Sequence, residues 1–288
     1  MIATLLRPAL ALVFASVAFT RTVAAEDVTP LTLAGAETFA YREGDTRMLL
    51  HVVKPAGWKA SDRRGALIFF FGGGWSRGTP EKSIGWAKWA ASLGLVGIAP
   101  DYRTKDRHDT SPLASVADGR AALRWVQDHA TELGLDPAQI VVGGNSAGGH
   151  VALWTGFTAT PPGSDPAEAP RAQPAGLVLF SAVSDTSGLS GYTPKRFGDH
   201  ATALSPVHQL EPRMPPILAF HGDADKTVPY AQAVALRDRL VAAGNSCELV
   251  TVPGGSHAFS TDLPEWKERS RALVREFLVA RGVLAAGP

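Results

Sequence analysis

The chain has 288 residues, of which 45% are apolar, and its formal net charge of +1 at neutral pH gives no basic field for nucleic acid. This length allows one large hydrophobic core, because α/β domains often exceed about 200 residues, and it excludes a second catalytic domain. The single cysteine, Cys247, excludes an intramolecular disulfide, and no metal-ligand spacing, dinucleotide fingerprint or phosphate loop is present, so we expect no metal and no cofactor.

Residues 1–25 have the pattern of a cleaved secretory signal. Arg7 precedes an apolar run over 9–19 that is too short to span a bilayer, and Val23-Ala24-Ala25 supplies small residues at the end of the segment. Its removal takes away two basic residues and no acidic one, which leaves a formal net charge of −1. We therefore predict a secreted or periplasmic domain over 26–288 without stable membrane insertion, and an uncleaved membrane anchor is the alternative.

The first apolar strands are predicted over 48–53 and 66–71, and the second runs directly into Gly72-Gly73-Gly74-Trp75. Consecutive glycines let the main chain adopt conformations that other residues avoid, so that bare N–H groups can approach a carbonyl oxygen. These amides, with that of Ala147, are candidates for an oxyanion hole, and Trp75 is a candidate substrate-binding residue. A flexible linker is the alternative interpretation.

Farther along, the pattern predicts a helix over 81–92, a strand over 94–99, a helix over 115–132 and a strand over 139–143. This last strand ends in Gly144-Asn145-Ser146-Ala147-Gly148, a G-x-S-x-G motif before a helix predicted over 147–158. Small flanking residues allow the sharp strand-to-helix turn that exposes a nucleophilic serine. Ser146 is therefore the candidate nucleophile, although glycine-rich turns also produce this motif by chance.

A serine hydroxyl needs a base to take its proton and a carboxylate to orient that base. A strand predicted over 217–221 ends in a loop with Asp223 and Asp225, and one over 247–252 ends in a loop with His257. His257 is the candidate general base, and either aspartate is a candidate acid. Of the other histidines, we expect His221 to pack within its loop and His150 to face the core.

The remaining segments complete an alternating pattern. A strand is predicted over 176–180 and helices over 229–243 and 264–281, which favours a mostly parallel sheet covered on both faces. Residues 160–174 hold five prolines and predict an exposed loop. Residues 184–213 form an insertion with Tyr192, Lys195, Arg196 and Phe197, which is a candidate cap over the active site or a surface decoration.

Together these motifs resemble the α/β-hydrolase superfamily, near the hormone-sensitive-lipase-like and acetyl-xylan-esterase-like bacterial carboxylesterases, which carry H-G-G-G-[FW] and G-x-S-A-G-G. The similarity covers roughly residues 45–282 and includes Asp101-Tyr102-Arg103 and the segment 118–125. The resemblance implies an α/β-hydrolase fold. The triad it implies is Ser146, Asp225 and His257, with Asp225 preferred over Asp223 for its place beside Val228-Pro229, and the oxyanion donors are Gly73, Gly74 and Ala147.

The sequence departs from that family at two positions. Phe71 stands where relatives place the histidine before the glycines, so any bracing hydrogen bond from that histidine is absent. Asn145 precedes the serine where many relatives carry an acid.

The leading functional hypothesis is an exported serine esterase that acts on short acyl esters, such as acetyl groups on plant polysaccharides, with small lipid or aryl esters as further candidates. The substrate is thus a small-molecule or carbohydrate ester, and the oligomeric state is left open. A serine peptidase of the prolyl-oligopeptidase type shares the order of the triad, but its propeller would not fit into the 40 residues between Glu26 and Ala66. A noncatalytic binding protein of this fold is a third hypothesis, although such proteins usually lack a triad member.

Overall fold

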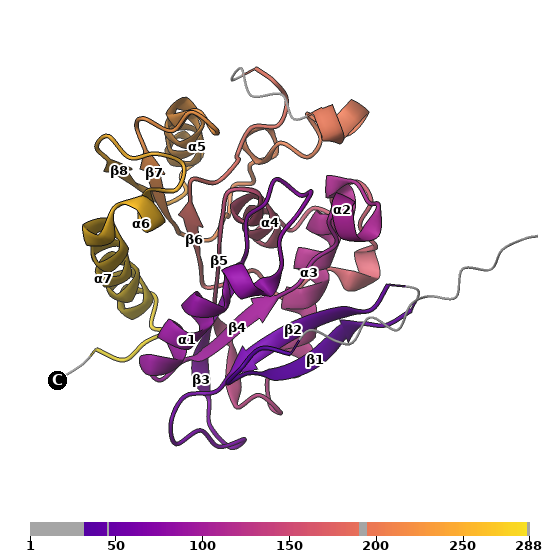
Figure 1. Ribbon diagram of the computed structural model, residues 1–288, viewed down its shortest axis with the longest axis vertical. Coiled ribbons are helices and arrows are strands. Elements are labelled where there is room, and N and C mark those ends of the chain that lie inside the picture. The colour runs from indigo at the N-terminus through magenta and orange to yellow at the C-terminus, as the bar shows by residue number, and fades with distance from the viewer. Residues whose placement is uncertain (1–31, 45, 190–194, 287–288) are drawn as a thin grey trace, which may run out of the picture. The chain divides into compact units, whose positions relative to one another are not determined.

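One mixed sheet of eight strands, in the order β1-β2-β4-β3-β5-β6-β7-β8, forms the centre of the computed structural model, which describes residues 32–44, 46–189 and 195–286 (Figure 1). The strands are β1 (Glu37–Arg42), β2 (Met48–Val53), β3 (Arg64–Phe70), β4 (Val96–Pro100), β5 (Leu135–Asn145), β6 (Gly176–Phe180), β7 (Ile217–Gly222) and β8 (Cys247–Val252). β2 pairs antiparallel with β1 and β4, and all other neighbours are parallel.

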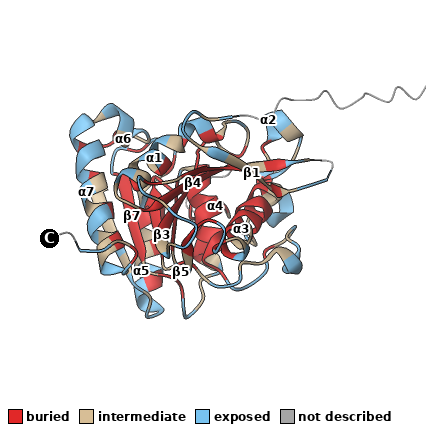
Figure 2. Ribbon diagram, turned by 90° about the horizontal axis from the view of Figure 1, so that it is seen from below, coloured by how far each residue is buried: buried red, intermediate tan, exposed pale blue. Residues whose placement is uncertain are grey.

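Helices cover both faces of the sheet, as the alternation of strands and helices predicted. They are α1 (Ile84–Ser92), α2 (Lys105–His108), α3 (Pro112–Asp128), α4 (Ala147–Thr155), α5 (Tyr230–Ala242), α6 (Phe259–Asp262) and α7 (Pro264–Ala280), with 3-10 turns η1 (Pro80–Lys82), η2 (Pro166–Glu168), η3 (Lys195–His200) and η4 (Pro206–His208). Along β3, Ile68 and Phe70 face the core that α3, α4 and α5 cover, whereas Leu67 and Phe69 face the core under α1 and α7. Figure 2 shows the buried strands between these layers.

All seven predicted strands and all five predicted helices are present, with ends that shift by a few residues. The sequence analysis missed β1, an edge strand in which only Tyr41 is buried, because such a strand lacks an apolar run. It also missed α2 and α6, which have four residues each. The proline-rich segment 160–174 contains only η2, as its prolines indicated.

The parallel pairing places the carboxyl ends of β3, β5, β7 and β8 at one edge of the sheet. Phe70 is in register with Gly144, and Gly222 with Val252. The loops with the glycines, the serine, the aspartates and His257 therefore gather at this edge, where open α/β sheets bind ligands. The expected signal segment 1–25 lies outside the described residues, and within those residues no helix is long and apolar enough to cross a membrane.

Candidate active site

Ser146 lies at the turn where β5 passes into α4. Its backbone has φ 55° and ψ −122°, a conformation that a residue with a side chain adopts only where its surroundings enforce it. The turn is so tight that a Cβ atom on Gly144 would lie 2.3 Å from the carbonyl oxygen of Gly148. Glycine is therefore required beside the serine, whose hydroxyl is presented at the end of the strand.

The side chains of Ser146, His257 and Asp225 form one hydrogen-bonded chain. His257 Nε2 lies 2.9 Å from Ser146 Oγ, and His257 Nδ1 lies 2.8 Å from Asp225 Oδ2. Because Nδ1 faces a carboxylate, it carries the proton of the neutral ring, and Nε2 is left to accept the proton of the hydroxyl. The structure thus brings together the three residues that the sequence analysis assigned to a triad.

The two candidate acids have different surroundings. The Asp225 side chain is fully buried, and its Oδ1 accepts hydrogen bonds from the amides of Thr227 at 2.8 Å and Val228 at 2.9 Å. Asp223 is exposed, and its Oδ1 accepts from the Gly254 amide at 2.6 Å. Asp225 contacts His257, whereas Asp223 links two neighbouring turns.

His221 makes a contact that the sequence analysis missed, since we expected this residue only to pack within its loop. It is buried, and its Nε2 lies 2.9 Å from the Val228 carbonyl oxygen and 3.2 Å from Asp225 Oδ2, so one N–H is shared between two acceptors. Burial raises the pKa of Asp225, but hydrogen bonds from His221, His257 and Val228 outweigh it and hold that pKa well below its usual range. At neutral pH Asp225 is therefore ionised, and its negative charge faces His257.

Residues 72–75, which we call the glycine loop, pack directly on the turn at Ser146. A Cβ atom on Gly148 would lie 2.2 Å from the carbonyl oxygen of Phe71, so only glycine allows the two backbones to meet. The amides of Gly73, Gly74 and Ala147 donate to no acceptor within the part of the chain that the structure describes. Free amides in a loop that packs on the serine turn are candidates for holding a developing oxyanion.

Tyr102 braces the glycine loop at Phe71, the position of the departure from the related esterases. The Phe71 and Tyr102 rings are stacked with centroids 4.1 Å apart, and Tyr102 Oη donates a 2.7 Å hydrogen bond to the Phe71 carbonyl oxygen. The amides of Lys105 and Asp106 in α2 also donate to the carbonyl oxygens of Trp75 and Ser76. The loop is therefore held by a tyrosine and by the start of a short helix.

Trp75 does not lie as a substrate-binding side chain would. Its ring is 1% exposed and packs edge-on against His150 and Phe197. The aromatic surface is consumed by packing, and the backbone of Trp75, at φ 57°, turns the glycine loop back toward the protein. We therefore correct the assignment of Trp75 to substrate binding: its ring supports the glycine loop by packing against His150 and Phe197.

The other sequence motifs have structural partners in the described chain. Arg103 donates two side-chain hydrogen bonds to the fully buried Asp118, at 2.7 and 2.8 Å. Arg120 donates to the carbonyl oxygens of Trp154 and Phe157, both at 2.8 Å, at the end of α4. The Arg103 contacts hold α3 to the segment after β4, and the Arg120 contacts hold α3 against α4. No group of histidine, cysteine and acidic side chains among the described residues could hold a metal ion.

Comparison with known proteins identifies the family. The profile of the BD-FAE family matches residues 50–193 and 178–240, which is more than half of the chain. The chain belongs to the BD-FAE family. Carboxylesterase NlhH of Mycobacterium tuberculosis is 30% identical over 226 residues, which cover 69% of this chain and 67% of NlhH.

Solved structures agree with this membership. Thermogutta terrifontis esterase 2 phosphorylated by paraoxon has a TM-score of 0.81 and 37% identity, and the match covers 90% of this chain and 99% of that one. The propionate-bound form of that enzyme has a TM-score of 0.80 and 37% identity, over 88% of this chain and 97% of that one. The predicted α/β-hydrolase fold and the predicted carboxylic ester hydrolase class are confirmed.

Replacement of Tyr102 by phenylalanine tests the brace at Phe71. We expect the free energy of unfolding to fall by about 1–3 kcal/mol, because the buried Phe71 carbonyl loses its donor, and kcat for ester hydrolysis to fall because the glycine loop loosens. Tyr41→Phe is the matched control, since Tyr41 Oη donates a 2.9 Å hydrogen bond to the Asp101 carbonyl oxygen away from that loop. Thermal melts and steady-state kinetics give both values; equal kcat losses in the two variants would contradict a specific brace.

Proposed function

We propose that this carboxylic ester hydrolase works by acyl transfer through Ser146. The observation that carries the proposal is the unbroken hydrogen-bond chain from Asp225 through His257 to Ser146, at a turn on which the glycine loop with its free amides packs. A nucleophile, its base, the partner of the base and a place for negative charge thus lie in one site. A binding protein of this fold would not require all four parts.

The proposed reaction has two halves. His257 Nε2 takes the hydroxyl proton as Ser146 Oγ attacks the ester carbonyl carbon, and the carbonyl oxygen becomes an oxyanion that the amides of Gly73, Gly74 and Ala147 stabilise. Collapse of this intermediate breaks the bond to the alcohol oxygen, which receives the proton from His257. Water then attacks the acyl-serine with the same base, which releases the carboxylic acid and restores Ser146.

Asp225 supports the reaction through His257. Its lowered pKa keeps a negative charge next to Nδ1 while the ring becomes an imidazolium, which stabilises that cation and fixes its orientation. His221 shares the same carboxylate oxygen and keeps it in place. The acid is therefore held on both oxygens, by two backbone amides on one side and by two imidazoles on the other.

Short acyl groups, and acetyl groups on plant polysaccharides among them, are the substrates that we propose. Support comes from the propionate-bound form of Thermogutta terrifontis esterase 2, which is 37% identical to this chain. Among the described residues, the buried rings of Trp75 and Phe197 are packed against each other, so they leave no channel between them for a long acyl chain.

Export through the leader over residues 1–25 is part of the proposal. Its basic start, short apolar run and small residues before Glu26 support this. Mass spectrometry of the protein recovered outside the cytoplasm should give a chain that begins near Glu26. A chain recovered only inside the cytoplasm, with residues 1–25 intact, would contradict export.

Ser146→Ala tests the nucleophile. We expect ester turnover to fall by about 10⁴-fold or more, because triad members act as a unit. The melting temperature should stay close to wild type, because among the described residues the hydroxyl hydrogen-bonds to His257 alone. Initial rates on p-nitrophenyl esters of increasing acyl length and on acetylated xylan should decline with length in the wild-type chain. Retention of more than a few per cent of wild-type activity in the variant would exclude Ser146.

Asp225→Asn compared with Asp223→Asn tests the acid. We expect a loss in kcat of about 10⁴-fold for Asp225→Asn, since an amide favours the wrong tautomer of His257. Asp223→Asn keeps an oxygen acceptor for the Gly254 amide and should retain activity near the wild-type level. A larger loss for Asp223→Asn would reassign the acid.

The Asp225→Asn variant also allows a prediction of how stability depends on pH. The pKa of Asp225 is lowered in the folded state, so its ionised form stabilises the fold above the unfolded pKa of about 3.9, and that contribution is lost as pH falls toward the folded pKa. The difference in melting temperature between the wild-type chain and Asp225→Asn should therefore shrink below about pH 4. A difference that is constant with pH would contradict an ionised Asp225.

A further inference from the structure

The segment between β6 and β7 reaches the glycine loop through Arg196 in η3. Nη1 of Arg196 donates a hydrogen bond to the carbonyl oxygen of Gly74, and a Cβ atom on Gly74 would lie 3.1 Å from that nitrogen. Within the described residues the Arg196 guanidinium has no carboxylate partner. The guanidinium of Arg196 is thus bonded to the backbone of the glycine loop.

Hydrogen bonds restrain the peptide planes on both sides of Gly74, and Arg196 supplies one of them. The Gly74 carbonyl belongs to the plane that continues to Trp75, and Arg196 holds it from outside the loop. The Gly73 carbonyl belongs to the plane that carries the Gly74 amide, and it accepts from the amides of Ser76 and Arg77, both at 3.2 Å. Because a glycine at φ 62° has no Cβ to limit its rotation, these hydrogen bonds set the direction of the free amide.

A second contact comes from Phe197, the residue next to Arg196. Its ring is 1% exposed and meets the Trp75 ring edge-on at a centroid distance of 4.8 Å and the His150 ring at 5.4 Å. The Trp75 and His150 rings also meet edge-on, at 5.2 Å. Three mutually packed rings therefore join η3, the glycine loop and α4, the helix that begins after Ser146.

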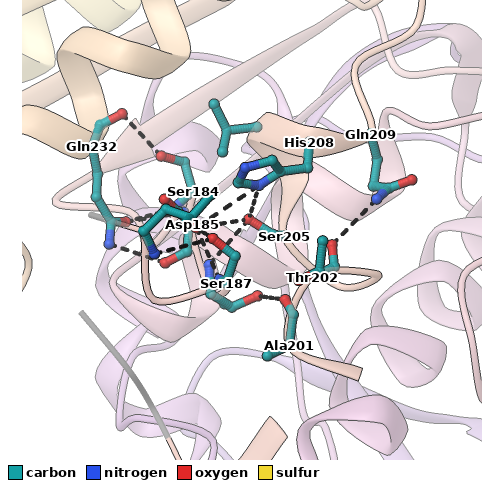
Figure 3. A network of polar contacts seen from close by, with 12 residues as sticks. Ser184, Asp185, Ser187, Ala201, Thr202, Ser205, His208, Gln209 and Gln232 are labelled. Carbon is teal, nitrogen blue, oxygen red and sulfur yellow. Dashed lines mark hydrogen bonds and ion pairs between the residues drawn. The ribbon is translucent and has the colours of Figure 1, made fainter. Parts of the chain in front are cut away.

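Buried polar contacts join the residues on either side of this segment (Figure 3). Asp185 Oδ1 accepts hydrogen bonds from the Ser187 amide at 2.9 Å and from Ser205 Oγ at 3.1 Å, and His208 Nδ1 lies 2.9 Å from Ser205 Oγ. Gln232 of α5 contacts the backbone of Asp185 through both its amide oxygen and its amide nitrogen. These contacts tie the two ends of the segment together and to the helix that follows the Asp225 loop.

Leu204, which lies between η3 and Ser205, is held by α4. His150 Nε2 lies 2.8 Å and Trp154 Nε1 3.1 Å from the carbonyl oxygen of Leu204. Burial lowers the pKa of His150 to about 4, so this ring is neutral at pH 7 and its Nε2–H donates to Leu204. The segment is therefore anchored to the same helix that orients Ser146.

We propose that Arg196 and Phe197 are positioning residues of the oxyanion hole. They hold the amides of Gly73 and Gly74 in the direction needed to donate to the oxyanion that forms at Ser146. This inference rests on the proposed function for the role of those amides. It assigns to η3, within the insertion predicted over 184–213, a task in catalysis that is distinct from covering the site.

The kinetic test compares Arg196→Leu, Arg196→Lys and the matched control Lys195→Leu, all in the full chain. Lys195 is the exposed neighbour of Arg196 in η3. For Arg196→Leu we expect kcat on p-nitrophenyl acetate to fall by about 10- to 100-fold, because small misplacements of catalytic groups cost rate, while KM and the melting temperature stay close to wild type. Arg196→Lys should recover part of the loss, since an ammonium group can donate to the same carbonyl, and Lys195→Leu should match the wild type.

A trifluoromethyl ketone distinguishes positioning from substrate contact. Its adduct with serine places an oxyanion in the hole, so its inhibition constant should rise in Arg196→Leu by about the same factor as kcat/KM falls. A normal kcat in Arg196→Leu would overturn the proposal. So would a rise in KM that is confined to an anionic ester such as the p-nitrophenyl ester of succinate, because Arg196 would then bind substrate directly.

Amide hydrogen exchange tests the contact independently of any activity. Peptides that contain Ser76 and Arg77, whose amides donate to the Gly73 carbonyl oxygen, should exchange faster in Arg196→Leu than in the wild-type chain, and those from Lys195→Leu should not. If the wild-type chain fails to hydrolyse esters, the proposed function fails, yet faster exchange in Arg196→Leu would still support the brace. Unchanged exchange with an active wild type would overturn the inference while the proposed function stands.

Discussion

The approach of two backbones, at Gly148 in the first turn of α4 and at the Phe71 carbonyl after β3, is the constraint on which the site depends. Any side chain at position 148 would collide with that carbonyl, and one at position 72 would collide with Asn145, so the serine turn and the glycine loop can meet only because both positions are glycine. The parallel register of β3 with β5 brings the two segments to the same edge of the sheet. The glycine loop and the turn at Ser146 are neighbours as a result of this packing.

Support for the glycine loop comes from three directions. Tyr102 holds the Phe71 carbonyl, α2 holds the carbonyls of Trp75 and Ser76, and Arg196 holds that of Gly74. All of these bonds end on carbonyl oxygens, which leaves the amides of Gly73 and Gly74 free. A loop with three glycines has many accessible conformations, and external hydrogen bonds are the means by which a fold selects one of them.

The sequence was sufficient for the features that are local. Apolar runs predicted seven of the eight strands, and the motifs around Ser146, Asp225 and His257 indicated side chains that the fold does bring into contact. It was insufficient where the path of a turn or distant packing sets the contact. His221 and Asp225 are four residues apart, but their contact depends on the turn between them, which the sequence did not predict. The burial of Trp75 depends on Phe197, 122 residues away in the chain, and the Gly74 carbonyl is held by Arg196 at the same separation.

Reaction with paraoxon, followed by peptide mass spectrometry, tests the central claim most directly. An organophosphate is attacked by an activated serine and leaves a stable phosphoryl group there. Thermogutta terrifontis esterase 2 is phosphorylated by paraoxon. We expect one phosphoryl group for each chain, on Ser146, and a large loss of labelling rate when His257 is replaced by alanine. Labelling of another serine, such as the buried Ser181 with its φ of 43°, or rapid labelling without His257, would contradict it.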